Sequence, residues 1–184
     1  MDYILPVIQT QRLSLRPWSA EDIDTMHQLW TGAEMRRYLW DDLAISRVQA
    51  AETVMRAIES AERPGVGMWS IRERESGEAI GFCGLRCIDG LQDVEVLYGL
   101  APAAWKQGLA FEAARAVIDY GFATGRFDRV FGRTDELNRA SIRVLERLGM
   151  RFESLTLIEG RPTAVYSLKK PMGASSTCCG ETPS

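Results

Sequence analysis

The sequence is poor in the residues that form metal centres and disulfide frameworks. It has one histidine and four cysteines among 184 residues, without a CxxC pair, so a zinc site has no adequate ligand set. Cys83 and Cys87 lie among apolar neighbours and are interpreted as small packing residues. His27 is interpreted as a surface or packing residue rather than a catalyst. No metal is therefore expected.

Long apolar runs and an excess of basic residues are also missing. No segment approaches the length that crosses a bilayer, and the opening MDYILP lacks the basic and apolar regions of a secretion signal. A net charge of -3 argues against a nucleic-acid-binding surface and gives weak support to a neutral or cationic substrate. We therefore expect a cytoplasmic protein that binds neither membranes nor nucleic acids.

The length and the 46% of hydrophobic residues fit one globular domain, which we expect to span residues 1–170. The last segment, residues 171–184, is small and polar and has no apolar periodicity. Its composition predicts a disordered tail.

Apolar periodicity along the chain predicts seven strands and four helices. Around residues 94–134, a strand, a crossing helix and a further strand normally form a right-handed parallel unit. The expected strands are residues 12–18, 68–73, 79–88, 94–98, 129–134, 151–158 and 163–168, and the expected helices begin near Ser19, Ser46, Gln107 and Asn138.

The stretch 93–124 contains the most informative pattern. Its alternating residues predict a strand that ends at Pro102, and Gln107 then opens an amphipathic helix. The first turn of a helix has unpaired N–H groups and a partial positive charge, so it accepts a phosphate when side chains leave room. Gly108 provides that room, and Lys106 adds a cation. An ordinary strand-turn-helix corner is the alternative, because glycine is common there.

The segment YGLAPAAWKQGLAFEA, residues 98–113, resembles the acetyl-CoA-binding motif of the GNAT N-acyltransferase superfamily, which reads Gln/Arg-x-x-Gly-x-Gly/Ala. It is most similar to the branch of ribosomal-protein-alanine N-acetyltransferases, which often read Tyr-x-x-x-Pro-x-x-Trp-x-x-Gly-x-Ala-x-Glu-Ala. Trp105 departs from the general motif but agrees with this branch. The resemblance spans roughly residues 11–168 and implies an N-acetyltransferase with acetyl-CoA as cosubstrate.

The resemblance implies an α/β (α+β) GNAT fold with a mixed central sheet of about seven strands and helices on both faces. Two splayed parallel strands would hold the pantetheine of acetyl-CoA between them. A bulge is expected at residues 98–100, and the alternative is that Gly99 only eases packing. The expected cofactor contacts are the backbone of Leu100 and Ala101 for the pantetheine, and the N–H groups of Lys106, Gln107, Gly108, Leu109, Ala110 and Phe111 for the diphosphate.

A second motif, Asn-x-x-Ser-x-x-x-Leu-x-x-x-Gly-Met, begins at Asn138 and resembles the fourth-helix motif of the same branch. By that resemblance, Asn138 lies near the CoA chain and Ser141 donates a proton to the departing thiolate. On its own, the pattern fits a helix N-cap followed by a tolerated serine. The two roles are compatible.

Glu95, on the central strand, is the expected general base, acting through water. The alternative is an exposed carboxylate paired with an arginine.

Transfer needs a neutral amine, and an α-amine with a pKa of about 7.7 to 8.0 meets that need more often than a lysine with a pKa of about 10.4. No Ser-His-Asp or Cys-His arrangement is evident in the sequence, so direct attack by the amine is favoured over a covalent intermediate.

Acceptor recognition is assigned to Tyr38, Trp40 and Asp41, where carboxylates beside aromatic residues could receive a cation. A solvated loop with one packed tryptophan is the alternative. We expect a monomeric or homodimeric enzyme that acetylates a protein N-terminal α-amine. The alternatives are a small amine, such as an antibiotic, polyamine or amino acid, and a non-catalytic CoA-binding regulatory domain.

Overall fold

The computed structural model describes residues 4–40, 42–59, 61, 64–88, 93–125 and 127–171. Two of the sequence predictions lie outside these residues. They are the acceptor role of Asp41 and, beyond residue 171, the tail.

Within the described residues, eight strands form one mixed sheet in the order β1-β2-β3-β4-β5-β6-β8-β7. Only β5 and β6 are parallel neighbours there. The sequence predicted about seven strands, and the additional one is β1, a two-residue strand at the edge of the sheet. The strands are β1 (Ile8–Gln9), β2 (Leu13–Pro17), β3 (Gly67–Glu73), β4 (Ala79–Cys87), β5 (Val94–Leu100), β6 (Arg129–Asp135), β7 (Arg151–Ile158) and β8 (Arg161–Lys169).

The described α-helices include one that the sequence pattern did not predict. This helix, α2, has only Met35 buried, so it has no apolar periodicity to reveal it. None of the described helices is long and apolar enough to cross a membrane. The helices are α1 (Ile23–Thr31), α2 (Ala33–Leu39), α3 (Arg47–Glu59), α4 (Leu109–Thr124) and α5 (Arg139–Arg147).

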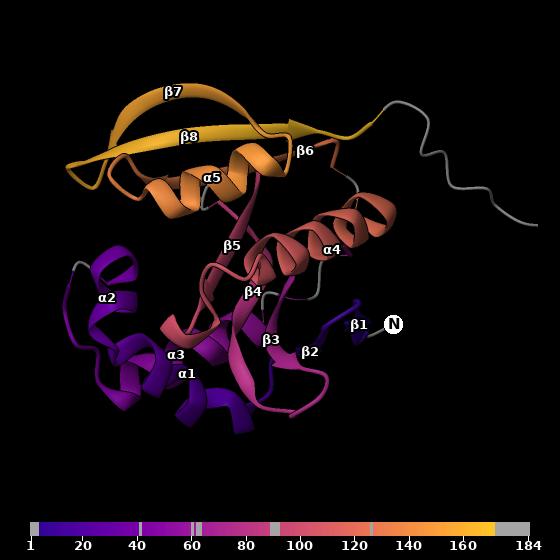
Figure 1. Ribbon diagram of the computed structural model, residues 1–184, viewed down its shortest axis with the longest axis vertical. Helices are drawn as coiled ribbons and strands as arrows, with labels where there is room; N and C mark the ends of the chain where they lie inside the picture. Colours follow the sequence, from indigo (N-terminus) through magenta and orange to yellow (C-terminus); the bar gives the residue numbers. More distant parts are fainter. Residues whose placement is uncertain are drawn as a thin grey trace, which may run out of the picture.

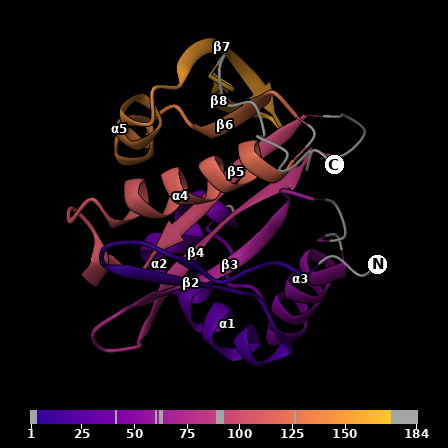
Figure 2. The same ribbon diagram turned by 90° about the vertical axis from the view of Figure 1, so that its right-hand side faces the viewer.

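The helices cover both faces of the sheet, as predicted (Figures 1 and 2). Helix α4 lies on one face, where Val117 and Ile118 are buried in the main core. Helices α1 to α3 lie on the opposite face around a second core that contains Trp18, Trp30 and Phe82. Successive side chains of β5 point to opposite faces of the sheet. The even-numbered residues lie on the side of α4 and the main core, and the odd-numbered residues lie on the side of the second core.

The parallel strands β5 and β6 separate soon after they begin. They pair only at Val94 with Val130 and at Glu95 with Phe131, although β5 continues to Leu100. Figure 1 shows β5 diverging from β6 beyond this point. The predicted splay of the two central parallel strands is therefore confirmed.

The predicted bulge in β5 is wrong. The register between β4 and β5 runs without a shift from Gly81 opposite Leu100 to Cys87 opposite Val94. A Cβ on Gly99 would lie 2.7 Å from Phe82 Cε1 and 2.8 Å from Met35 Cε. Glycine is therefore needed there because the second core packs directly against the strand, which confirms the packing alternative.

Candidate active site

The connection from β5 to α4 ends in a left-handed turn at the helix N-terminus. Gly108 is the N-cap residue with a φ of 77°, and Lys106 also has a positive φ, 62°. Because Gly108 offers no side-chain cap, the first N–H groups of α4 have no partner from that residue. This arrangement favours an anion at the start of the helix.

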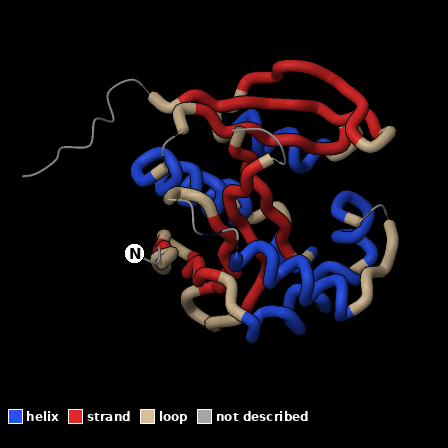
Figure 3. The backbone as a smooth tube through the Cα atoms, turned by 180° about the vertical axis from the view of Figure 1, so that it is seen from behind, coloured by secondary structure: helices blue, strands red, loops and turns tan. Residues whose placement is uncertain are grey.

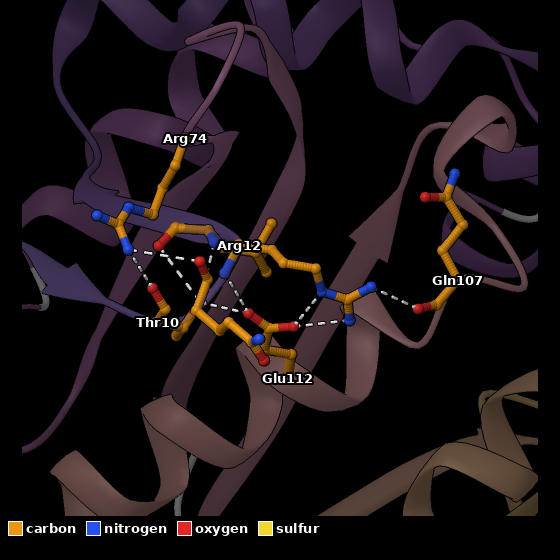
Figure 4. A network of polar contacts seen from close by, with 7 residues as sticks. Thr10, Arg12, Arg74, Gln107 and Glu112 are labelled. Atoms are coloured by element: carbon orange, nitrogen blue, oxygen red, sulfur yellow. Dashed lines mark hydrogen bonds and ion pairs between the residues drawn. The ribbon is translucent and has the colours of Figure 1, made fainter.

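A partly buried ion pair fixes this loop to the N-terminal hairpin (Figure 4). Glu112, in the first turn of α4, accepts hydrogen bonds from the Thr10 hydroxyl at 2.6 Å and from Arg12 Nε at 2.8 Å. Arg12 Nη1 also donates to the carbonyl oxygen of Gln107 at 3.0 Å. Desolvation alone would raise the pKa of Glu112, but the hydrogen bonds from Thr10 and Arg12 outweigh it and hold that pKa below its ordinary value.

Two guanidinium groups flank Gly108. A Cβ placed on this glycine would lie 3.4 Å from Arg147 Nη1 and 3.8 Å from Arg12 Nη2. Arg147 is exposed, and its guanidinium carbon lies 4.1 Å from the centre of the Phe111 ring. Neither arginine was predictable from local sequence, because only the fold brings the start of β2 and the end of α5 to this loop.

The backbone at the end of β5 already has partners within the chain. The carbonyl oxygen of Leu100 accepts a hydrogen bond from Trp105 Nε1 at 2.6 Å, and the N–H of Ala101 donates to the carbonyl oxygen of Ile80 at 2.7 Å. Trp105 therefore braces the loop against the strand. A carbonyl oxygen has a second acceptor position, so the pairing of Leu100 and Ala101 with pantetheine stays a prediction.

Two hydroxyl groups meet between β5 and α5. Tyr98 Oη lies 2.9 Å from Ser141 Oγ. Asn138 Oδ1 accepts a hydrogen bond from the Ser141 N–H at 3.1 Å, which confirms the N-cap interpretation of Asn138. Burial raises the pKa of Tyr98 well above its ordinary value, so its phenol is protonated at neutral pH. The contact of Tyr98 with Ser141 was not predicted, because the strand pattern alone accounts for a tyrosine at this position.

Glu95 lies at the last parallel residue pair of β5 and β6 and is only 2% exposed. Arg133 donates from Nε to Glu95 Oε1 at 2.8 Å and from Nη2 to Oε2 at 2.9 Å. Arg86 Nε donates to Oε2 at 3.0 Å. The carboxylate is therefore buried between two arginines rather than exposed beside one. These three hydrogen bonds leave about one of its roughly four acceptor positions for a water molecule.

In the predicted acceptor segment, Trp40 and Asp42 form contacts within the protein. Trp40 packs on Trp30 with ring centroids 5.5 Å apart, and its indole N–H is buried without a partner among the described residues. Arg36 Nε pairs with Asp42 Oδ1 at 2.9 Å. Tyr38 is 39% exposed. A packed tryptophan, which was the alternative for this segment, is therefore present.

Cys83 and His27 have packing contacts. Cys83 is fully buried, and this burial raises the pKa of its thiol. His27 Nε2 lies 3.1 Å from the carbonyl oxygen of Ile45. Across the described ranges, no group of three or more His, Cys, Asp or Glu residues is placed to hold a metal ion.

Comparison with known proteins matches residues 12–151 to the acetyltransferase (GNAT) domain family. The chain is 31% identical over 153 residues to the uncharacterized N-acetyltransferase p20 of Bacillus licheniformis, covering 82% of this chain and 85% of p20. It is 27% identical over 143 residues to spermidine N(1)-acetyltransferase of Escherichia coli K12, covering 77% and 74%. A shorter match to the uncharacterized protein YkkB of Bacillus subtilis, 37% identical over 107 residues, spans 57% of this chain and 62% of YkkB.

Solved structures share the fold. The RimL ribosomal L7/L12 alpha-N-protein acetyltransferase, solved in complex with coenzyme A, aligns with a TM-score of 0.76 and 18% identity. The alignment covers 90% of this chain and 98% of RimL.

The clamp formed by Glu112 generates a prediction about stability and pH. Glu112→Gln should lower the free energy of unfolding at pH 7 by about 1–3 kcal/mol, because the largely buried side chain at position 112 loses the charge that accepts hydrogen bonds from Thr10 and the exposed Arg12. The folded-state pKa of Glu112 lies below its ordinary value of 4.5, so its contribution is complete above that value and is lost as pH falls through the folded pKa. In urea titrations, the difference from wild type should therefore shrink as the pH falls below 4.5.

Asp119→Asn is the matched control, because the exposed pair of Asp119 with Arg115 lies on the same helix and contributes about 0.5 kcal/mol at most. Equal destabilisation by both variants, or a Glu112→Gln effect that does not depend on pH, would contradict the clamp.

Proposed function

This chain belongs to the GNAT acetyltransferase family, and from that premise we propose that it transfers the acetyl group of acetyl-CoA to the N-terminal α-amine of a protein in the cytoplasm. Membership of the family makes the chain an acetyl-CoA-dependent N-acetyltransferase. The acceptor and the roles of individual residues are our proposal. The observation that supports it best is the open N-terminus of α4 beside the parted strands β5 and β6.

On the donor side, the diphosphate of acetyl-CoA accepts hydrogen bonds from backbone N–H groups of residues 106–111. The helix terminus and the Lys106 cation favour its negative charge. Beyond Glu95, the facing edges of β5 and β6 lack the ladder that would pair their backbone groups. The amide groups of pantetheine can supply that pairing, with Leu100, Ala101 and Asn138 as the proposed contacts.

The donor and the acceptor approach from opposite faces of β5. Tyr98 is directed to the α4 face, whereas Glu95, three residues earlier, is directed to the other face. The amine nitrogen attacks the thioester carbonyl carbon, and a water held by Glu95 removes a proton from that nitrogen. As the carbon–sulfur bond breaks, the sulfur receives a proton from Ser141. Tyr98 keeps its own proton and donates a hydrogen bond to the Ser141 oxygen, which then regains a proton from solvent water.

An α-amine is the proposed acceptor because its pKa, about 7.7 to 8.0, leaves part of it neutral without help from the enzyme. The RimL neighbour is itself an alpha-N-protein acetyltransferase, which is consistent with this choice. A polyamine is the second candidate, favoured by the similarity to a spermidine acetyltransferase.

The donor assignment predicts the effect of a change at Gly108. Gly108→Glu should reduce CoA affinity at least about 100-fold in isothermal titration, because it places a carboxylate where the diphosphate binds and strains a residue with positive φ. Gly77→Glu is the control, since Gly77 has a similar φ of 71° in an open turn. Retained CoA affinity in the first variant, or equal loss in both, would refute the assignment.

The base assignment predicts the effect of a change at Glu95. Glu95→Gln should lower kcat by about 100-fold or more with CoA affinity unchanged, because the water loses its proton acceptor. Rates should be measured from pH 6 to 9, together with the melting temperature, because the same change weakens the contacts to Arg86 and Arg133. A lower melting temperature with wild-type kcat would assign Glu95 to structure alone.

A further inference from the structure

We propose that the acceptor is an acidic protein N-terminus, in which carboxylates shortly after the reacting α-amine bind a basic surface. This surface lies beside the opening between the parted strands β5 and β6. The proposal rests on the proposed function and narrows it to one class of substrate. We call this surface the basic face. It comprises the side chains of Arg86, Arg129, Arg133, Arg151 and Lys169, together with Glu95 and Glu153.

The sheet register places these residues on one face. Arg86 lies opposite Glu95 in the β4–β5 ladder, and Arg133 reaches Glu95 from β6. On β6 and β8, Arg129 is opposite Lys169 and Phe131 is opposite Ser167. Gly132, between them, faces Leu145 of α5, so the odd-numbered residues of β6 face away from that helix. Figure 3 looks onto this side of β6, β8 and β7, where no described helix lies over the strands.

The two acidic residues of the basic face already have partners. Glu95 is held by Arg86 and Arg133. Glu153 accepts hydrogen bonds from Ser167 and, at 2.7 Å, from Arg129 Nη2, and these bonds hold its pKa below the ordinary value. Both carboxylates are therefore already paired with arginines of the basic face.

The other two cations of the basic face lie outside these ion pairs. Arg151 and Lys169 are exposed, and neither forms an ion pair within the part of the chain that the structure describes, although the charge of Lys169 contributes to the lowered pKa of Glu153. Toward the β7–β8 turn, Glu159 offsets part of the charge of Arg133, and Asp135 lies at the end of β6. The basic face is nevertheless positive on a chain whose net charge is -3. The net charge, which favoured a neutral or cationic substrate, therefore does not describe this surface.

A cavity lies on the basic face within reach of the opening. It measures about 550 Å³ and is lined in part by Arg129, Arg151 and Lys169. Such a volume is within the range of about 300–1,000 Å³ that ligand pockets have. Arg129 lies two residues before Phe131, the residue that pairs with Glu95, so the two are about 7 Å apart along β6. The neighbouring strands β8 and β7 lie about 5 Å and about 10 Å to the side of β6. An extended chain spans about 3.3–3.6 Å per residue, so an acceptor whose amine lies level with Glu95, at the base of the opening, would reach the cavity with side chains at about positions 2 to 4.

Charge complementarity decides between the acceptor classes. A polyamine would bring several cations to Arg151 and Lys169 and be repelled. An acidic N-terminus places carboxylates there while its amine lies at the strand opening, and arginine binds carboxylates well through paired N–H groups. Nucleic acid is a different occupant of a basic surface, and the experiment below tests it separately.

The test compares acceptor peptides that share a first residue and carry Glu, Gln or Lys at about positions 2 to 4, with spermidine as a further acceptor. We expect kcat/KM for the Glu peptide to exceed that for the Gln peptide by about 10-fold, with the Lys peptide lowest. Raising the salt from about 50 mM to about 500 mM should reduce this preference. The double variant Arg151→Glu/Lys169→Glu should abolish or reverse it.

The control is Arg16→Glu/Arg56→Glu, which makes the same change of net charge at exposed positions on β2 and α3 and should keep the preference. Equal use of all three peptides by wild-type protein would overturn the acidic specificity and leave N-terminal acetylation standing. Acetylation of spermidine alone would overturn the proposed function itself. If the double variant lost affinity for an RNA oligonucleotide but kept the Glu preference, the basic face would belong to nucleic acid, and the proposal would be overturned.

Discussion

The separation of β5 from β6 after Glu95 is the constraint on which the other features depend. Two parallel strands that stop pairing in the middle of a sheet leave backbone groups without a ladder, which is costly unless something fills the opening. Glu95 and Arg133 join the strands at the last point of contact, while Tyr98 and Ser141 join β5 to α5 further along. The opening therefore has charged groups at its base and protonated hydroxyl groups on its wall.

The two sides of this opening differ in chemistry. On the α4 side, the loop around Gly108 is held by Arg12 and Glu112, so its N–H groups are fixed before any ligand arrives. On the other side, the face of β6, β8 and β7 that no described helix covers carries arginines and a lysine beside a cavity. This division suits a transferase, because the donor can remain bound through the backbone while acceptors are selected by side-chain charge.

Local sequence patterns predicted most of the fold, because strands and helices with one buried face have clear periodicity. They failed for β1 and α2, which are short and bury too few residues to produce a period. The family resemblance implied a bulge at residues 98–100, but Gly99 is instead required to leave room for Phe82 and Met35 from other elements. Of the candidate site, the glycine turn and the Asn138 cap were predictable, since both are local. The contributions of Arg12, Tyr98 and Arg147 depend on contacts between distant segments, as does the burial of Glu95 between two arginines.

The most direct test of the account is a crystal structure of this protein with CoA bound at saturation. The account predicts the diphosphate at the N-terminus of α4, hydrogen-bonded to N–H groups among residues 106–111. It also predicts the sulfur between β5 and β6, beside the hydroxyl groups of Tyr98 and Ser141. A diphosphate bound elsewhere, or a sulfur outside the opening between the strands, would contradict it.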